Sequence, residues 1–138
     1  MEKMVGAIYA VPLDKIYKLF DGKSKVFVKV TGHRSTKLLP KHKIVFYESR
    51  GNKKIVGEGI VVTVEFLTPE EVLEKYQDEL FISEEEFADY IGKRHRVLTL
   101  RLKGLKRYSQ PIQSKTAITM GGKYLTAKQY DLLFQETG

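Results

Sequence analysis

The feature that most constrains this fold is a pair of apolar runs, KIVFYES at residues 43–49 and KIVGEGIVVTVEF at residues 54–66. Both runs are rich in β-branched and aromatic residues, which favour strands. The intervening Arg50-Gly51-Asn52-Lys53 has the residue types of a tight connection. We therefore predict an antiparallel hairpin over residues 43–66.

Glu58 stands between two glycines in the second strand of this hairpin. Strict alternation places Val56, Glu58 and Ile60 on one face, where an inward carboxylate needs hydrogen bonds, a cation or a proton. A lysine from residues 23–29 is then the expected partner. A β-bulge at Gly57 or Gly59 would instead rotate Glu58 into solvent and account for both glycines, and we prefer this interpretation.

The chain before the hairpin predicts a strand, a helix and a second strand. Residues 6–11 form a short apolar run, and Ile16, Leu19 and Phe20 then recur at helical spacing before Gly22. From residue 25 the period changes to two, which predicts a strand over residues 25–30. Phe27 lies on the face opposite the valines, where it is either core or a surface for stacking a base; core is the preferred interpretation.

Beyond the hairpin, two short helices have clear start signals. Thr68 and Glu71, and then Ser83 and Glu86, have the spacing of capping boxes, and proline follows Thr68. The C-terminal part predicts a strand over residues 98–102, a bend at residues 109–111, a strand within residues 112–119 and a final helix capped by Thr126.

Five or six short strands with small peripheral helices predict an α+β fold that is mainly β. A partly closed β-barrel removes the exposed edges of such strands. A length of 138 residues suits one hydrophobic core, so we expect a single domain over residues 1–138.

Charge is divided unevenly along a chain whose formal net charge is +7. Residues 1–60 carry +8, residues 61–92 carry −9 and residues 93–138 carry +8. If the two basic segments share a face and the acidic one stands apart, that face is suited to phosphates. The alternative is a solvated surface rich in Lys and Glu, of the kind common in heat-adapted, thermostable proteins.

Composition also limits the cellular setting. The chain has no cysteine, which fits a reducing cytoplasm, and no apolar segment reaches the ~18 residues of a spanning helix. We therefore expect a cytoplasmic protein without a membrane anchor. Its three histidines lack ligand spacing, so no metal site is predicted, and no cofactor fingerprint is present.

The order of these pieces resembles the PUA-like superfamily, especially its ASCH and EVE branches and an archaeal family of the same build. The segments that carry the resemblance are GAIYAVPLDKIYKLFDGKSKVFVKV, PKHKIVFYES, KKIVGEGIVVTVEF, the helical insertion, and RYSQPI leading to GGKYLTAKQYDLL. The resemblance covers nearly the whole chain. It implies a pseudobarrel that binds RNA or a modified base in a cleft beside the first helix, with catalysis in a minority of members.

The chain departs from the ASCH signature G-x-K-x-x-E-x-R. Aligned from Gly22, the lysine, glutamate and arginine positions hold Ser24, Phe27 and Lys29. Lys23 and Lys25 flank the first altered position, so a small strand shift would restore an amine. The resemblance therefore supports binding better than it supports the amidohydrolase chemistry of some ASCH proteins.

The leading hypothesis is a non-catalytic nucleic-acid-binding domain, for RNA in preference to DNA, with a pocket for one exposed base, modified or unmodified. Cationic side chains would contact phosphates, Tyr47 or Phe27 would stack, and Glu48 or Ser49 would read polar edges. The candidate binding residues are Lys23, Lys25, Lys29, Arg34, Lys37, Tyr47, Glu48, Ser49, Arg50 and Lys123.

Two alternatives remain open. One is a small amidohydrolase acting on acylated nucleosides, with Lys23 or Lys25, Glu58 and a threonine or serine as its catalytic groups. The other is a protein-interaction module that uses the acidic helices. The sequence does not indicate an oligomeric state.

Overall fold

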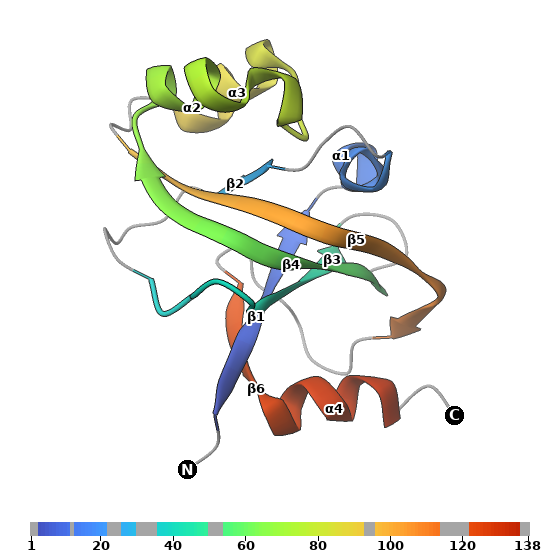
Figure 1. Cartoon of the computed structure of the whole chain (residues 1–138). Helices are drawn as coiled ribbons and strands as arrows, with labels where there is room; N and C mark the ends of the chain where they lie inside the picture. Colours follow the sequence, from blue (N-terminus) through green and yellow to red (C-terminus); the bar gives the residue numbers. More distant parts are fainter. Residues whose placement is uncertain are drawn as a thin grey trace.

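The structure, a computed structural model, describes residues 3–11, 13–21, 26–29, 36–49, 54–92, 96–113 and 122–135. A curled half-barrel sheet of six strands dominates it, in the order β2-β5-β4-β3-β1-β6 (Figure 1). The strands are β1 (Met4–Val11), β2 (Val26–Lys29), β3 (Lys43–Glu48), β4 (Lys54–Leu67), β5 (Val97–Gln113) and β6 (Lys123–Thr126). The helical elements are α1 (Leu13–Ile16), η1 (Tyr17–Phe20), α2 (Pro69–Tyr76), η2 (Gln77–Glu79), α3 (Glu84–Ile91) and α4 (Ala127–Gln135). The predicted class, α+β and mainly β, is confirmed.

The predicted pairing of the hairpin strands is also confirmed. Strands β3 and β4 are antiparallel, with Lys43 opposite Ile60 and Tyr47 opposite Ile55. The connecting residues 50–53 lie outside the described residues. Strand β3 pairs on its other side with β1 in parallel, so it lies inside the sheet.

Close packing explains both glycines of β4. A Cβ atom on Gly57 would lie 2.5 Å from Cζ of Phe20 and 2.6 Å from the carbonyl oxygen of Lys106. A Cβ atom on Gly59 would lie 2.7 Å from Cδ2 of Leu105. Because atoms do not approach so closely, a side chain at Gly57 would push the β5 backbone away from β4, and one at Gly59 would displace the Leu105 side chain.

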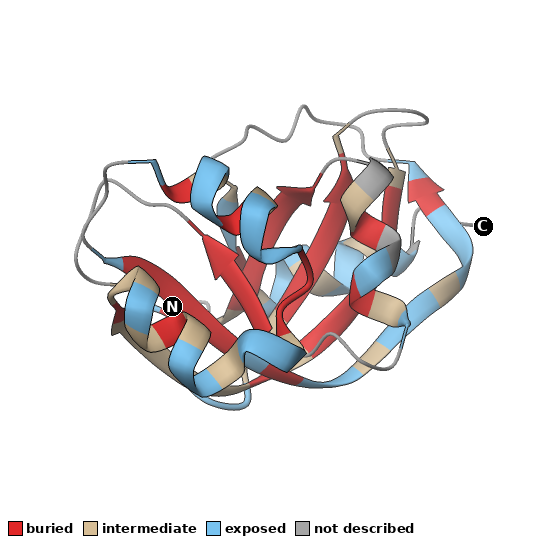
Figure 2. Ribbon diagram, turned by 90° about the horizontal axis from the view of Figure 1, so that it is seen from above, coloured by how far each residue is buried: buried red, intermediate tan, exposed pale blue. Residues whose placement is uncertain are grey.

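Two clusters of buried side chains lie on the two faces of the sheet. The larger contains Phe27 and Phe46 and extends under α1, η1, α2 and α3. The smaller contains Val45 and Tyr47 and is covered by Tyr130 and Leu133 of α4. Figure 2 shows the sheet buried between helices that expose their outer sides. Because the side chains of β3 alternate between the two clusters, both faces of this strand are core.

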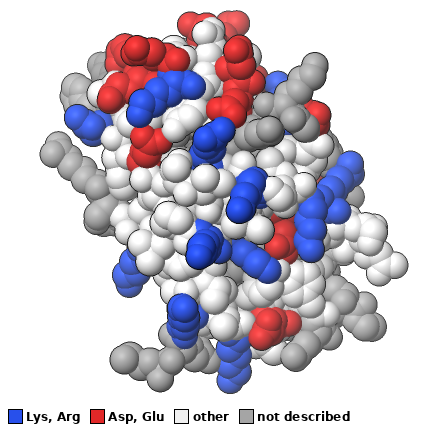
Figure 3. All heavy atoms as spheres, in the orientation of Figure 1, with Lys and Arg blue, Asp and Glu red and all other residues white. Residues whose placement is uncertain are grey.

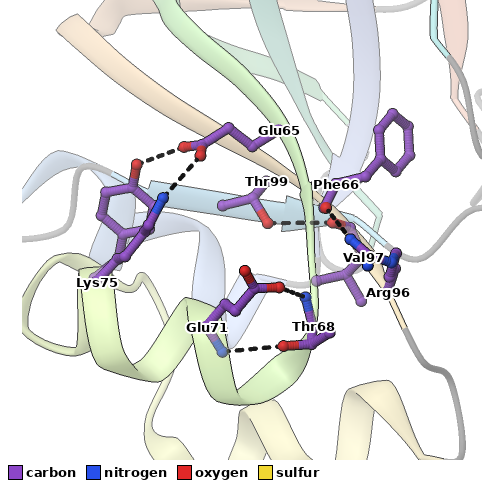
Figure 4. A network of polar contacts seen from close by, with 9 residues as sticks. Glu65, Phe66, Thr68, Glu71, Lys75, Arg96, Val97 and Thr99 are labelled. Atoms are coloured by element: carbon purple, nitrogen blue, oxygen red, sulfur yellow. Dashed lines mark hydrogen bonds and ion pairs between the residues drawn. The ribbon is translucent and has the colours of Figure 1, made fainter.

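The helical insertion is fixed to the sheet at its base. Both capping boxes are present, because Thr68 and Glu71, like Ser83 and Glu86, exchange hydrogen bonds between side chain and backbone. Glu65 of β4 accepts hydrogen bonds from Tyr76 at 2.6 Å and Lys75 at 3.2 Å, and the Lys75 bond is drawn in Figure 4.

A second contact lies at the other end of the insertion. Arg96 Nη1, after α3, donates to the carbonyl oxygen of Phe66 at 3.1 Å (Figure 4). The end of α2 and the residue Arg96 after α3 are therefore both attached to the end of β4. Val72, Phe87 and Ile91 add their side chains to the larger cluster, so the insertion is part of the core.

The C-terminal part differs from its prediction in strand boundaries. Strand β5 continues to Gln113, and the expected bend at residues 109–111 is a bulge, because Ile55 pairs with Ile112 while Gly57 pairs with Arg107. The expected strand within residues 112–119 falls largely outside the described residues, and β6 lies where no strand was predicted. Thr126 caps α4 as predicted, since its hydroxyl accepts from the backbone N–H of Gln129 at 3.2 Å.

Candidate functional site

A pocket of about 130 Å³ lies beside α1, on the face of the sheet that carries the larger cluster. It is lined by Ala10 and Val11 of β1, Lys15 of α1, Phe27, Val28 and Lys29 of β2, and Phe81, Ile82 and Tyr90 of the insertion. Since a cavity of about 150 Å³ accommodates a benzene-sized ring, this pocket has room for one flat ring rather than for a whole nucleotide.

Aromatic side chains make the inner wall of this pocket rigid. The ring of Phe27 stacks on Tyr9 with centroids 5.6 Å apart and an interplanar angle of 26°. It also packs against Phe81 at 5.1 Å and, edge to face, against Phe46 at 5.6 Å. Phe27 is buried, as preferred from the sequence, and it is core and pocket wall at once.

Lys29 brings a buried amine to the pocket. The residue is 6% exposed, and its Nζ lies 5.6 Å from the centroid of the Tyr9 ring, within cation–π range. Burial lowers the pKa of this lysine. Burial also raises the pKa of Tyr9 to about 12, with nearby Tyr124 and Tyr90 adding to the effect, so the phenol stays protonated at neutral pH.

The acidic insertion forms the opposite wall of the pocket through its apolar residues. Its carboxylate Glu86 lies 3.7 Å from Lys15 Nζ and accepts a hydrogen bond from Lys18 Nζ at 3.2 Å. The backbone N–H of Ser83 is the main cause that lowers the pKa of Glu86 to about 2, and Lys18 contributes. The carboxylate is therefore ionised at neutral pH and links α3 to α1 and η1.

The predicted residues of β3 lie near this pocket or behind it. Glu48 is buried and pairs in register with Val11, which lines the pocket. The backbone N–H of Ser49 donates to the carbonyl oxygen of Val11 at 3.0 Å. Tyr47 belongs to the smaller cluster, on the other face of the sheet.

The other predicted binding residues are more dispersed. The backbone N–H of Lys37 donates to the hydroxyl of Tyr124 at 3.1 Å, and its Nζ lies 5.8 Å from that ring. Lys123 is exposed on β6, opposite Ile8. Lys23, Lys25, Arg34 and Arg50 lie outside the described residues.

Glu58 is the buried acid of a separate cluster on the other face. It is only 4% exposed, so the expectation that a bulge turns it into solvent is wrong, although the β4–β5 register does shift on both sides of it. Its Oε1 accepts hydrogen bonds from Tyr108 at 2.7 Å and Tyr130 at 2.6 Å. Its Oε2 lies 3.6 Å from Lys43 Nζ, which also donates to the Tyr130 hydroxyl at 2.9 Å.

Sequence reasoning missed these three partners of Glu58. It expected a cation from residues 23–29, whereas the cation is Lys43 of the same hairpin. Lys43 lies two residues along β3 from Val45, which is opposite Glu58. The two tyrosines come from β5 and α4. Burial, followed by the hydrogen bond to Glu58, raises the pKa of each phenol, so both remain donors.

Charge is segregated on the face seen in Figure 3. Acidic side chains gather over α2 and α3, while Lys and Arg spread across the middle, over β4 and β5. The exposed cations of β5 are Arg101, Lys103, Lys106 and Arg107. In the described part of the chain, the two basic segments supply cations to different hollows, because Lys15 and Lys29 line the pocket beside α1 whereas Lys106 and Arg107 line another.

Among the described residues, no group of three His, Cys, Asp or Glu side chains is placed to hold a metal ion. None of the helices in the described ranges has the length and apolar character needed to span a bilayer.

Comparison with protein families and relatives places the sequence in a defined group. The model of the family described as "Domain of unknown function (DUF365)" matches residues 4–127. The relative described as "Uncharacterized protein MJECS03", from Methanocaldococcus jannaschii, is 33% identical over 106 residues, which cover 68% of this chain and 98% of that protein.

Solved structures show the same fold at low sequence identity. ASCH from Zymomonas mobilis has a TM-score of 0.82 at 17% identity, over 97% of this chain and 96% of that chain. A mutant of that protein has a TM-score of 0.83 at 15% identity, over 97% of this chain and 99% of that chain. The N-terminal domain of Staphylothermus marinus McrB has a TM-score of 0.59 at 16% identity, over 100% of this chain and 99% of that chain. The predicted ASCH and PUA-like pseudobarrel is confirmed.

Proposed function

Because this chain belongs to the DUF365 family and has an ASCH and PUA-like fold, we propose that it binds single-stranded RNA and holds one exposed base beside α1. The observation that carries this proposal is the pocket itself. It has room for one ring, aromatic walls and one buried amine. This combination of size, aromatic walls and a hydrogen-bond donor suits a base, because a base binds by stacking and by a few hydrogen bonds at its edge.

Within the pocket we assign different roles to its residues. Phe27 and Phe81 supply flat apolar walls, and Lys29 supplies a donor for a carbonyl oxygen or ring nitrogen of the base. Lys23 and Lys25, which precede β2 in the sequence, are proposed to contact the adjoining phosphates.

Binding to RNA and to an abasic strand of the same length separates base recognition from charge attraction. We expect wild-type protein to bind the RNA at least about 5-fold more tightly, since stacking one base contributes about 1–3 kcal/mol. Lys29→Met should reduce this preference, because the amine that reads the base edge is lost. Fluorescence anisotropy of a labelled strand measures both affinities.

Lys37→Met is the matched control, because Lys37 is exposed and lies beside Tyr124, outside the pocket lining. It should leave the preference for RNA over the abasic strand unchanged. Equal affinity of wild-type protein for the two strands would contradict the proposal. For about 4–6 phosphate contacts, the affinity should fall with salt at a log-log slope of about −3 to −4.

Hydrolysis of acylated nucleosides is the second candidate function. The buried position of Lys29 favours it, because burial lowers the pKa of this lysine and so increases the fraction of neutral, nucleophilic amine. The acid proposed for such an enzyme, Glu58, lies in the cluster on the other face of the sheet. Lys23 and Lys25 are the remaining sequence candidates.

Incubation with N-acylated nucleosides tests this second function. If it is correct, wild-type protein releases the acid, and at least one of Lys23→Ala, Lys25→Ala, Lys29→Met and Glu58→Gln abolishes turnover. Turnover that survives all four changes would reject the assignment. The protein-interaction alternative cannot be tested by deleting the acidic helices, because Val72 and Phe87 belong to the core.

A further inference from the structure

A second hollow, of about 390 Å³, lies between the C-terminal half of β5 and α4. Its lining includes Lys106, Arg107, Tyr108, Gln110 and Phe134, none of which lines the pocket beside α1. Its volume falls in the range of small-molecule sites, about 300–1,000 Å³. It is therefore large enough for a nucleotide.

The bulge in β5 creates this hollow. Three residues of β4, Ile55 to Gly57, face a six-residue segment of β5, Arg107 to Ile112. The extra residues of β5 leave the regular ladder, and bulges of this kind redirect side chains. Tyr108 is thereby brought to Glu58, and Gln110 to the rim.

The Glu58 cluster holds the aromatic part of the hollow in place. Tyr108 and Tyr130 both donate to Oε1 of Glu58, at 2.7 and 2.6 Å. Phe134 packs edge to face on both rings, with centroids 5.6 Å from Tyr108 and 5.0 Å from Tyr130. Phe134 nevertheless remains 39% exposed, so a fixed aromatic ring is presented to solvent.

The rim of the hollow is cationic. Lys106 and Arg107 are exposed on β5, and Lys103 continues the series along the same strand. The carboxylate of Glu58 beneath them already accepts two phenol O–H groups and pairs with Lys43. A fixed exposed ring beside cations is what single-stranded nucleic acids require, since bases stack on the ring and phosphates meet the charges.

We propose that the hollow between β5 and α4 is a second nucleotide site, in which Phe134 stacks a base and Lys106 and Arg107 contact its phosphates. The inference rests on the proposed function, because the same RNA strand would also insert a base beside α1. Strands β4 and β5 link the surroundings of the two sites at Gly57. The carbonyl of Lys106 lies against Gly57 beneath Phe20 of η1, which directly follows α1.

The test measures affinity for RNA strands from about 4 to about 16 nucleotides, the range of site sizes for single-strand-binding folds. For wild-type protein, we expect affinity to rise steeply once a strand spans both sites. Phe134→Ala should remove this rise and weaken binding of the longest strand by about 5- to 100-fold. It should leave binding of the shortest strand unchanged.

Leu132→Ala is the matched control, because Leu132 is 41% exposed on the same helix and does not line the hollow. It should retain the rise with length. Lys106→Gln tests the charge without disturbing the core, and it should make the salt slope for the longest strand about 0.7 less steep. That variant keeps the test valid if thermal melting shows that Phe134→Ala unfolds.

The possible failures are distinguishable. If wild-type protein binds RNA and Lys29→Met weakens it, but Phe134→Ala and Lys106→Gln bind every strand like wild type, the second site is rejected and the proposed function stands. If wild-type protein binds no RNA, both fail. Competition by polyglutamate as effective as that by RNA would also reject the nucleotide site, because an acidic peptide offers charge without a base.

Discussion

Lys29 and Glu58 are buried on opposite faces of the sheet, and their surroundings differ. On one face, the amine of Lys29 lies over the Tyr9 ring and lines a pocket. On the other, the carboxylate of Glu58 accepts two phenol O–H groups and pairs with Lys43. The first arrangement leaves a buried amine next to space that a ligand can enter, whereas the second joins β3, β4, β5 and α4.

Under the proposed function, this difference separates a side chain that contacts a ligand from one that stabilises the fold. A buried charge is tolerated when hydrogen bonds compensate for its lost hydration. Glu58 has this compensation within the protein, so its removal should affect stability. For Lys29, burial lowers the pKa, so the fold disfavours its ammonium form and its removal should affect binding more than stability.

Glu58→Ala should cause the largest loss of stability. The change leaves two phenols and Lys43 without their shared acceptor, and breaking such buried networks costs about 3 kcal/mol. Glu58→Gln keeps an acceptor oxygen and should cost about 1 kcal/mol. Urea unfolding measures both values, and equally small losses for the two variants would contradict the structural role.

Tyr130→Phe should have the next largest effect. It removes one hydrogen bond to the carboxylate but keeps the ring against Phe134, so we expect a loss of about 1.5 kcal/mol. Tyr124→Phe, at an exposed tyrosine on β6, provides the comparison and should lose less than about 0.5 kcal/mol. Urea unfolding of both variants checks the difference, and equal losses would mean that the network contributes little.

Lys29→Met should change the free energy of unfolding at neutral pH by less than about 1 kcal/mol, because an apolar side chain suits a buried site. The pH dependence is more informative. As pH rises from the lowered pKa of folded Lys29 to the ordinary 10.5, the unfolded chain binds more protons, so wild-type protein gains stability relative to the variant. A constant difference across that interval, measured by urea unfolding, would show that burial does not shift this lysine.

Lys18→Met should have the smallest effect, although it breaks a contact between η1 and α3. The Lys18–Glu86 pair spans 3.2 Å, but the lysine side chain is 45% exposed. Exposed pairs contribute about 0.2–1 kcal/mol and are screened by salt. We therefore expect a loss of about 0.5 kcal/mol that disappears in about 1 M salt, as measured by thermal melting. A loss equal to that of Glu58→Ala would remove the contrast between the two faces.

Local chemistry explains what could be predicted from the sequence. The capping boxes at Thr68 and Ser83 need only residues three apart, and the hairpin needs only alternation and a turn. The class of fold follows from the number and length of the apolar runs. Alternation places Phe27 on the face opposite the valines of β2, so its core position requires that this face is covered as well.

The Glu58 cluster could not be predicted because it depends on long-range contacts. Tyr108 is 50 residues from Glu58 in sequence, and Tyr130 is 72 residues away. The expectation that a bulge at Gly57 or Gly59 turns Glu58 into solvent failed for a related reason. Close contacts from neighbouring elements, rather than a bulge that exposes Glu58, explain the two glycines. Phe20 and Leu105 occupy the space that side chains there would need.

The candidate pocket was predicted only in part. Lys29 was among the cations expected to contact phosphates, but neither its burial nor the contribution of the acidic insertion was predicted. Phe81, Ile82 and Tyr90 reach the pocket because the insertion folds back over β2, where Val26 forms a bridge with Leu80. No pattern in the acidic helices indicates that approach.

The central claim is that a base enters the pocket beside α1, and titration of isotope-labelled protein with short single-stranded RNA tests it most directly. We predict that the backbone amide signals of Val28, Lys29 and Ile82 shift on titration and that an abasic strand of equal length leaves them unchanged. Signals at these three residues that move equally with both strands, or with neither, would contradict the claim.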